Sequence, residues 1–364
     1  MIQKLKSRTA VSLHHELHTH TLSNASGMRV SFLNYGARMV ELCVPDRHGE
    51  RRNIVLGYSD PNAYLHDPFY LGATVGRYAN RIQAGRVRCQ EIDLQLATDE
   101  TGEHLHGGPL GFDSQFWLID ESVSNHQYLR MTLLSPSGDQ GYPGTVLVTA
   151  EYQLSEDSIL SLSMTAHTDQ KTPFGLSQHS YFNLDGIFPI SNQSARKAGN
   201  TFDHLVTLPS DTFLSTGPDQ IPLAHASPVD QTPMDFRRER RLGEQFDHFM
   251  SLDSQLQRAK GYDHCWCYPV KNTELTTNAV VASPKSGIEL TVRSNQPGAQ
   301  FYGGNNLKPV TINGQCYYVH PYEAFCIEPQ SYPNGPNRCD SPNAWLLPGE
   351  QYEFSVEWVF RVRN

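Results

Sequence analysis

The chain has 364 residues, of which 38% are hydrophobic and 18% are charged, and its formal net charge at pH 7 is −9. This composition is that of a folded globular protein, and the lack of a Lys/Arg run together with the negative charge argues against nucleic acid or an anionic membrane surface as the main partner. Given the negative charge, we expect a neutral or weakly polar small molecule as the ligand. No stretch approaches the roughly 20 apolar residues of a membrane span.

The N-terminal segment, residues 1–25, contains basic residues and histidines at positions 14, 15, 18 and 20, but no apolar run of signal-peptide length. We expect this segment to be less ordered than the rest and its histidines to be solvated. The seven cysteines are odd in number and scattered, a pattern that does not predict a disulfide framework. A cytoplasmic location is therefore the simplest expectation.

Short apolar or alternating runs, separated by Gly, Pro, Asn or Asp, predict strands along most of the chain. Clear examples are residues 28–44, 127–135, 145–154, 159–168, 287–295 and 352–362. Helical periodicity is weak, and Arg237–Leu256 is the best segment for short helices. Because no repeat or linker divides the chain, we expect one all-β domain over residues 1–364, built as two packed layers or a barrel.

Residues 72–82 read GATVGRYANRI and combine backbone freedom at Gly76 with the polar side chains of Arg77, Asn80 and Arg81. The segment lacks the Gly-Lys-Ser/Thr ending of a phosphate-binding loop, so that interpretation is rejected. Arginine and asparagine donors suit sugar hydroxyls. The alternative is a surface turn with solvated arginines.

Residues 103–113 read EHLHGGPLGFD, and alternation places His104 and His106 on the same strand face. Two histidines at this spacing can hold a metal ion, but a third ligand at suitable spacing is missing. His264 and the nearby cysteines could also be metal ligands, but the sequence offers no second paired cluster to complete such a site. We therefore predict no metal site.

Residues 172–186, TPFGLSQHSYFNLDG, place His179, Tyr181 and Asn183 on one face of a strand and the apolar Phe182 and Leu184 on the other. The polar face has the composition of a binding surface, and a histidine can donate a proton near neutral pH. The alternative is a partly buried histidine with a purely structural role.

Two further segments add polar groups beside aromatic rings, namely GYDH at 261–264 and AQFY at 299–302. They contribute Asp263 and Gln300. Carbohydrates are bound by planar polar side chains that fork onto hydroxyls and by aromatic faces that cover C–H surfaces. Together with the arginine and asparagine of residues 72–82, and with Trp266 or Tyr181 as the aromatic face, these residues could form a sugar site.

Residues 321–337, PYEAFCIEPQSYPNGPN, place Glu328 where a strand meets a proline. Alternation puts Cys326 and Glu328 on one face, with Phe325 and Ile327 on the other. Because Pro329 cannot donate to a sheet ladder, the strand should stop or become an edge there. A carboxylate at such a strand end is a candidate general base.

Taken in order, the motifs GRYANRI, LHGGPLGFD, TPFGLSQHSYFNL, GYDH and AFCIEPQSYPNGPN make the chain resemble the aldose 1-epimerases, the galactose mutarotases. The likeness covers nearly the whole chain, and five ordered motifs are far more specific than any one of them. It implies a large antiparallel β-sandwich, the galactose mutarotase-like supersandwich, with a few short helices. It also implies interconversion of the α and β anomers of free aldohexoses such as galactose and glucose, without cofactor or metal.

Matched residue by residue, the resemblance implies that Glu328 is the catalytic base and His179 the general acid. The residues implied to hold the sugar are Asn80, Arg81, His106, Asp263 and Gln300. The sequence departs from the family pattern at Gly175 and Gln178, where asparagine is usual, and this leaves the preferred sugar open.

The interconversion of anomers requires one residue that accepts a proton and one that donates a proton. Opening a hemiacetal ring removes a proton from the C1 hydroxyl and protonates the ring oxygen. A glutamate with an unperturbed pKa of about 4.3 is ionised at pH 7, and an imidazole with a pKa of about 6.5 can be the partner acid.

Three alternatives remain open. A glycoside hydrolase using Asp263 and Glu328 would need carboxyl groups about 5–5.5 or 6.5–9.5 Å apart. A hexose-6-phosphate 1-epimerase would need a basic cluster, for which Arg77, Arg81 and Arg86 are the candidates. A non-catalytic sugar-binding or sensor protein would not need the acid–base pair. A monomer and a homodimer are both compatible with the sequence.

Overall fold

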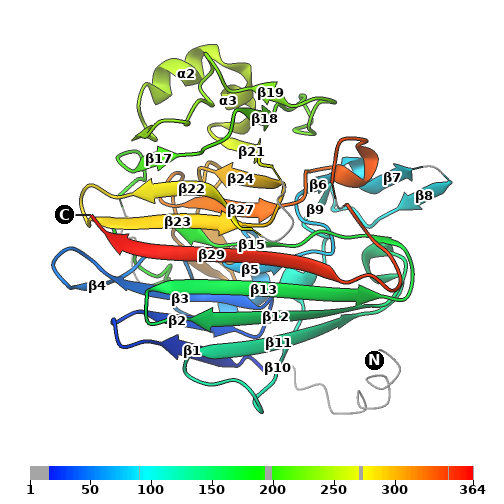
Figure 1. The fold of residues 1–364 in the computed structure, drawn as a ribbon, viewed down its shortest axis with the longest axis horizontal. Helices are drawn as coiled ribbons and strands as arrows, with labels where there is room; N and C mark the ends of the chain where they lie inside the picture. The colour runs from blue at the N-terminus through cyan, green and yellow to red at the C-terminus, as the bar shows by residue number, and fades with distance from the viewer. Residues whose placement is uncertain (1–15, 90, 193–198, 270–273, 343, 364) are drawn as a thin grey trace.

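The computed structural model describes residues 16–89, 91–192, 199–269, 274–342 and 344–363, and strands dominate them (Figure 1). The largest sheet is antiparallel and has nine strands. In spatial order these are β10 (Leu118–Ile119), β11 (Tyr128–Ser135), β12 (Val146–Leu154), β13 (Ile159–Thr168), β29 (Tyr352–Val362), β23 (Ile288–Ser294), β22 (Thr276–Ala282), β17 (Leu205–Thr207) and β20 (Arg240–Arg241). The alternating runs of the sequence thus correctly predicted its long central strands.

Two smaller antiparallel sheets complete the main layers. The six-stranded sheet has the order β16 (Tyr181–Phe182), β27 (Phe325–Gln330), β24 (Gly298–Tyr302), β21 (Asp263–Cys267), β18 (Thr212–Leu214) and β19 (Ser227–Pro228). The four-stranded sheet has the order β1 (Thr19–Ser23), β2 (Arg29–Leu33), β3 (Arg38–Pro45) and β4 (Arg51–Asn53). Of the N-terminal segment 1–25, residues 1–15 lie outside the described residues, whereas Thr19–Ser23 pairs with β2.

Short paired strands and short helices make up the rest of the described structure. The strand pairs are β5 (Ala73–Val75) with β15 (Ser177–His179), β6 (Arg81–Ile82) with β9 (His104–Leu105), β7 (Arg86–Cys89) with β8 (Ile92–Gln95), β14 (Thr172–Pro173) with β28 (Trp345–Leu346), and β25 (Val310–Ile312) with β26 (Gln315–Tyr317). The helices are α2 (Phe246–Leu252) and α3 (Ser254–Ala259), with 3-10 turns at η1 (Pro61–His66), η2 (Gln83–Gly85), η3 (Phe112–Ser114), η4 (Asp139–Gly141) and η5 (Gly335–Asn337). Helix α2 lies within the segment Arg237–Leu256 where short helices were expected, and α3 begins in that segment and ends beyond it. No helix among the described ranges is long and apolar enough to cross a membrane.

The main core lies between the nine-stranded and six-stranded sheets. Strands such as β12 alternate between buried and partly exposed residues, so each turns one apolar face inward. One buried cluster joins Val148 and Val356 of the large sheet to Phe301, Phe325 and Ile327 of the six-stranded sheet. The predicted all-β sandwich is confirmed. Because β24 and β27 turn these apolar residues toward the core, their alternate residues project from the opposite face of the six-stranded sheet.

Strand β27 is a central part of that opposite face of the six-stranded sheet. All of its residues, Phe325–Gln330, are buried, since the sheet is covered on both sides. The strand does not stop at Pro329, which pairs with Ala299 of β24. On the other side, β16 pairs only with Phe325 and Cys326, so the missing N–H of Pro329 interrupts no ladder there. The sequence therefore correctly indicated an edge at Pro329 but not a strand end.

Candidate active site

Three neighbouring strands carry polar side chains on the face of the six-stranded sheet that is turned away from the main core. Glu328 of β27 lies opposite Gln300 of β24 in the antiparallel register. Asp263, at the start of β21, reaches Gln300, whose Nε2 donates a hydrogen bond of 2.6 Å to Asp263 Oδ1. Side chains directly opposite in an antiparallel pair share a face. The register of the three strands thus brings together Asp263 and Glu328, which are 65 positions apart in the sequence.

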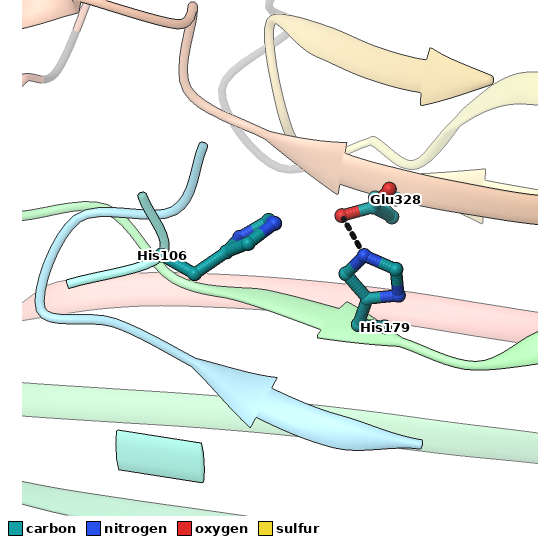
Figure 2. Close-up of side chains that lie close together, drawn as sticks. All are labelled: His106, His179 and Glu328. Atoms are coloured by element: carbon teal, nitrogen blue, oxygen red, sulfur yellow. Dashed lines mark ion pairs between the residues drawn. The ribbon is translucent and has the colours of Figure 1, made fainter. Parts of the chain in front are cut away.

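His179 approaches Glu328 from a separate short strand, β15, which pairs with β5. The imidazole Nε2 lies 3.6 Å from Glu328 Oε2, and both side chains are almost fully buried (Figure 2). The ring of Tyr181 stacks on the imidazole at 5.0 Å between centroids and 28° between planes. The predicted acid and base therefore face each other directly.

His106 completes a cluster with this pair, its ring centroid 5.1 Å from that of His179 (Figure 2). Strand β9 ends at Leu105, and His106 takes a left-handed conformation with φ of 52°. The strand alternation therefore does not reach His106, and the prediction that His104 shares its face was wrong. His104 instead contacts the carbonyl of Ala97 and the hydroxyl of Tyr142 at 2.5 and 2.7 Å, in a structural role.

Asn80 and Arg81 enter the site from the turn that leads into β6. The backbone N–H of Asn80 donates to His106 Nδ1 at 3.2 Å. Arg81 Nη2 lies 3.9 Å from Asp263 Oδ2 and donates to Gln220 Oε1 at 3.1 Å. All seven residues named as site candidates from the sequence are thus linked by short contacts or by strand register.

Several buried polar atoms of this cluster have no hydrogen-bond partner among the described residues. They are Glu328 Oε2, Gln300 Oε1 and Arg81 Nε. Buried polar groups in proteins are nearly always partnered, because an unpartnered group costs about 1–3 kcal/mol. Unpartnered polar atoms in one cluster suit a ligand that carries several hydroxyl groups, because each hydroxyl can both donate and accept a hydrogen bond. The Arg81 and Asp263 side chains are the most exposed of the set, at 17% and 11%, so the site is most accessible on their side.

Burial changes the proton affinities of the central pair. It raises the pKa of the Glu328 carboxyl well above its usual range, with Asp263 adding to the effect and Arg81 opposing it. Burial lowers the pKa of the His179 imidazole to about 3. The sequence-based expectation of a glutamate with its ordinary pKa does not allow for this environment. Both shifts favour an uncharged pair, in which the carboxyl keeps its proton and the imidazole takes none, and such a coupled pair titrates as a unit.

The same three side chains also have the composition of a metal site. His106, His179 and Glu328 each present a ligand atom, and these atoms lie within 4.8 Å of one another. However, the Asn80 N–H donates to His106 Nδ1, so the neutral ring carries its proton on Nε2. A protonated nitrogen is a donor and not a metal ligand. The hydrogen bonding therefore suits His106 to a sugar oxygen better than to a metal ion.

One sequence-based interpretation needs correction, and one residue at the site was missed. Trp266 belongs to the main core, where its indole N–H donates to the carbonyl of Met234, so it is not an aromatic face for a sugar. Tyr70 was not predicted, although its ring lies 4.7 Å from that of His106 and 6.0 Å from that of His179. Tyr70 follows no recognisable motif, and a contact between segments distant in sequence leaves no local signal.

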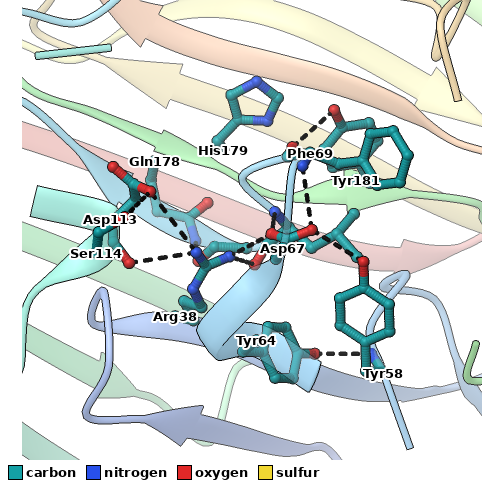
Figure 3. A network of polar contacts seen from close by, with 12 residues as sticks. Arg38, Tyr58, Tyr64, Asp67, Phe69, Asp113, Ser114, Gln178, His179 and Tyr181 are labelled. Carbon is teal, nitrogen blue, oxygen red and sulfur yellow. Dashed lines mark hydrogen bonds and ion pairs between the residues drawn. The ribbon is translucent and has the colours of Figure 1, made fainter. Parts of the chain in front are cut away.

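A buried ion pair supports the loop that carries Tyr70 (Figure 3). Arg38 Nη1 lies 2.7 Å from Asp67 Oδ2, and both side chains are almost completely buried. Asp67 also accepts hydrogen bonds from the backbone N–H groups of Phe69 and Leu71. The Phe69 carbonyl in turn accepts a bond from the hydroxyl of Tyr181, the ring that stacks on His179. The pair therefore holds together the loop and the tyrosine that border the site.

We expect Asp67→Asn to lower the free energy of unfolding by about 3–5 kcal/mol, because it removes the nearest charged partner of the buried Arg38 and leaves the Asp113 carboxylate, at 3.9 Å, as the remaining one. The control is Asp93→Asn, since Asp93 pairs with Arg86 at 2.9 Å but is 58% exposed. Exposed pairs contribute about 0–1 kcal/mol, so the control should lie within that range. Urea unfolding measures both, and equal effects would contradict the structural importance of the Arg38–Asp67 pair.

The antiparallel sandwich places the chain among proteins with the galactose mutarotase-like fold. A galactose 1-epimerase from Lactobacillus acidophilus superposes with a TM-score of 0.78 at 26% identity, covering 96% of this chain and 100% of that one. An aldose epimerase homologue from C. elegans superposes with a TM-score of 0.82 at 24% identity, with the same two coverages, and this shows the shared fold.

Sequence comparison gives the family. The family model described as aldose 1-epimerase matches residues 18–358. Pig galactose mutarotase is 34% identical over 336 residues, which is 92% of either chain. The aldose 1-epimerase of Escherichia coli K12 is 31% identical over 342 residues, 93% of this chain and 94% of that one. The chain belongs to the aldose 1-epimerase family and is accordingly an enzyme of the carbohydrate isomerase class.

Proposed function

We propose that this protein interconverts the α and β anomers of free aldohexoses such as galactose and glucose, with Glu328 as base and His179 as acid. The observation that carries this assignment is the contact between Glu328 Oε2 and His179 Nε2 at 3.6 Å, buried among polar groups that lack partners. Asn80, Arg81, His106, Asp263 and Gln300 hold the sugar hydroxyls.

The raised pKa of the Glu328 carboxyl and the lowered pKa of the His179 imidazole support the following order of steps. With sugar bound, the shared proton passes from Glu328 to His179, which creates a carboxylate and an imidazolium together without changing the net charge. The carboxylate removes the proton of the C1 hydroxyl while the imidazolium protonates the ring oxygen, and the bond between C1 and that oxygen breaks. Rotation about C1–C2 then presents the other face of the aldehyde, and ring closure reverses both transfers. Each general acid or base contributes about 10²–10⁴ in rate.

The remaining polar residues fit the holding role. Asp263 Oδ1 is bonded to Gln300 and its Oδ2 lies beside Arg81, so the carboxylate is anchored by groups of the site. This anchoring disfavours a hydrolase in which Asp263 would act as proton donor. His106, with its Nε2 proton facing the site, is placed to donate to a sugar oxygen.

Two of the three arginines considered for a phosphate group are engaged elsewhere. Arg77 is buried and donates to the Ser135 hydroxyl and to four backbone carbonyls, including those of Pro143 and Gly144. Arg86 is half exposed and pairs with Asp93. Only Arg81 of the three lies in the site, and a phosphate dianion would call for more than one charged donor. A free sugar is therefore the favoured substrate over its 6-phosphate.

Polarimetry tests the proposal directly. Freshly dissolved α-D-galactose and α-D-glucose should approach anomeric equilibrium faster with the protein, and glucose 6-phosphate should respond much less. If neither free sugar responds, the proposed activity is wrong. A stronger response to the phosphate would favour the hexose-6-phosphate epimerase, and release of nitrophenol from a nitrophenyl glycoside would favour the hydrolase.

The proposed location is the cytoplasm. All seven cysteines are free, including the exposed Cys339. Unpaired cysteines are typical of a reducing compartment.

A further inference from the structure

One strand contacts both ring nitrogens of His179. Cys326 and Glu328 are two residues apart on β27 and project from the same face. Cys326 Sγ lies 3.5 Å from His179 Nδ1, and Glu328 Oε2 lies 3.6 Å from Nε2. The proposed mechanism uses Glu328 but assigns nothing to the thiol.

The orientation of the His179 ring needs such a contact. The torsion that turns an imidazole about its Cβ–Cγ bond is broad and roughly two-fold, so a half-turn would exchange a nitrogen for a carbon at each position. The other ring neighbours of His179 are the faces of Tyr181 and Tyr70 and the ring of His106. The stacked tyrosines restrict the plane of the ring but do not distinguish its two orientations. The Glu328 carboxyl at Nε2 and a polar atom at Nδ1 do distinguish them.

We propose that Cys326 is a positioning residue that accepts the Nδ1 proton of His179 and thereby keeps Nε2 directed at Glu328. This inference rests on the proposed function, in which Nε2 receives the shared proton and passes it to the ring oxygen. With the proton of the neutral ring on Nδ1, Nε2 has the free lone pair that accepts the proton from the Glu328 carboxyl.

A thiol suits this position for a chemical reason. Histidines that act as bases usually donate Nδ1–H to a carboxylate or a backbone carbonyl, which stabilises the imidazolium. Sulfur of a neutral thiol is only a weak acceptor. Burial raises the pKa of the Cys326 thiol well above its usual range, so the sulfur stays uncharged. Cys326 therefore orients the ring while leaving the imidazolium a strong acid, as protonation of the ring oxygen requires.

The test compares Cys326→Ala and Cys326→Ser with Cys43→Ala. Cys43 is the control, because it is a free, half-buried thiol on β3 of the four-stranded sheet, outside the proposed site. We expect the Cys326 alanine variant to lose about tenfold in kcat with KM within about twofold, since the lost interaction acts on proton transfer and not on sugar binding. The serine variant, whose hydroxyl can take the Nδ1 proton, should stay within about threefold of wild type, and the control should be unchanged.

Nitrogen-15 NMR of the His179 ring shows which of its nitrogens carries the proton. This would not change in the Cys326 variants if the thiol had a purely structural role. Wild type should show the proton on Nδ1, and the Cys326→Ala variant should show a mixture of the two tautomers at an unchanged melting temperature. A proton on Nε2 in wild type, or an alanine variant with wild-type kcat, overturns the inference. If Glu328→Gln is inactive while Cys326→Ala is fully active, only this inference fails. If wild type does not speed mutarotation at all, the proposed function fails, and the NMR result alone then decides whether the thiol holds the ring.

Discussion

Glu328→Gln is expected to lower kcat for mutarotation by about 10²–10⁴, because an amide cannot take the proton of the C1 hydroxyl. The side chain is 2% exposed, and an amide has nearly the same shape as a carboxyl group. Burial favours the uncharged carboxyl, so a neutral amide resembles the resting form and should leave the fold intact. Polarimetry gives the rate, and the urea midpoint confirms the fold.

The matched control for this variant is Glu323→Gln. Glu323 is also buried, but its Oε2 accepts a bond from the backbone N–H of His320, outside the proposed site. The control should keep wild-type kcat. A Glu328→Gln variant that lost only sugar affinity, with kcat preserved, would make Glu328 a sugar-holding residue and refute its role as base.

Local patterns in the sequence were sufficient to predict the long strands, whereas the choice of site residues came from the family resemblance. Alternation identified the long strands of the large sheet, because each has one apolar face toward the core. The same alternation placed Cys326 beside Glu328, although the thiol had no evident partner. The resemblance of five ordered motifs then singled out His179 and Glu328 from many other polar residues.

Other features depend on contacts that no local pattern contains. The buried pair of Arg38 and Asp67 joins segments 29 residues apart, and neither residue lies in a motif. The left-handed backbone at His106 separates its side chain from that of His104, and alternation assumes that such a break does not occur. The proton affinity of Glu328 depends on how completely the sheets enclose it, which composition and spacing do not express.

His179→Asn is the second change with a large expected effect, a loss of about 10²–10⁴ in kcat, because an amide cannot carry the proton to the ring oxygen. His106→Asn is the informative comparison. Both rings are buried in the same cluster, but His106 is proposed to hold the sugar, so its replacement should raise KM more than it lowers kcat. Equal kinetic effects of the two changes would contradict the division of roles.

The pair Glu328→Gln and His179→Asn tests whether acid and base act as one unit. In the proposed mechanism the two groups share one proton, so either change alone removes the transfer that creates base and acid together. The double variant should therefore be about as slow as the slower single variant, and not slower by the product of the two losses. Stopped-flow polarimetry on all three proteins measures this. Multiplicative losses would mean that each group acts independently, and the shared proton between Glu328 and His179 would have to be abandoned.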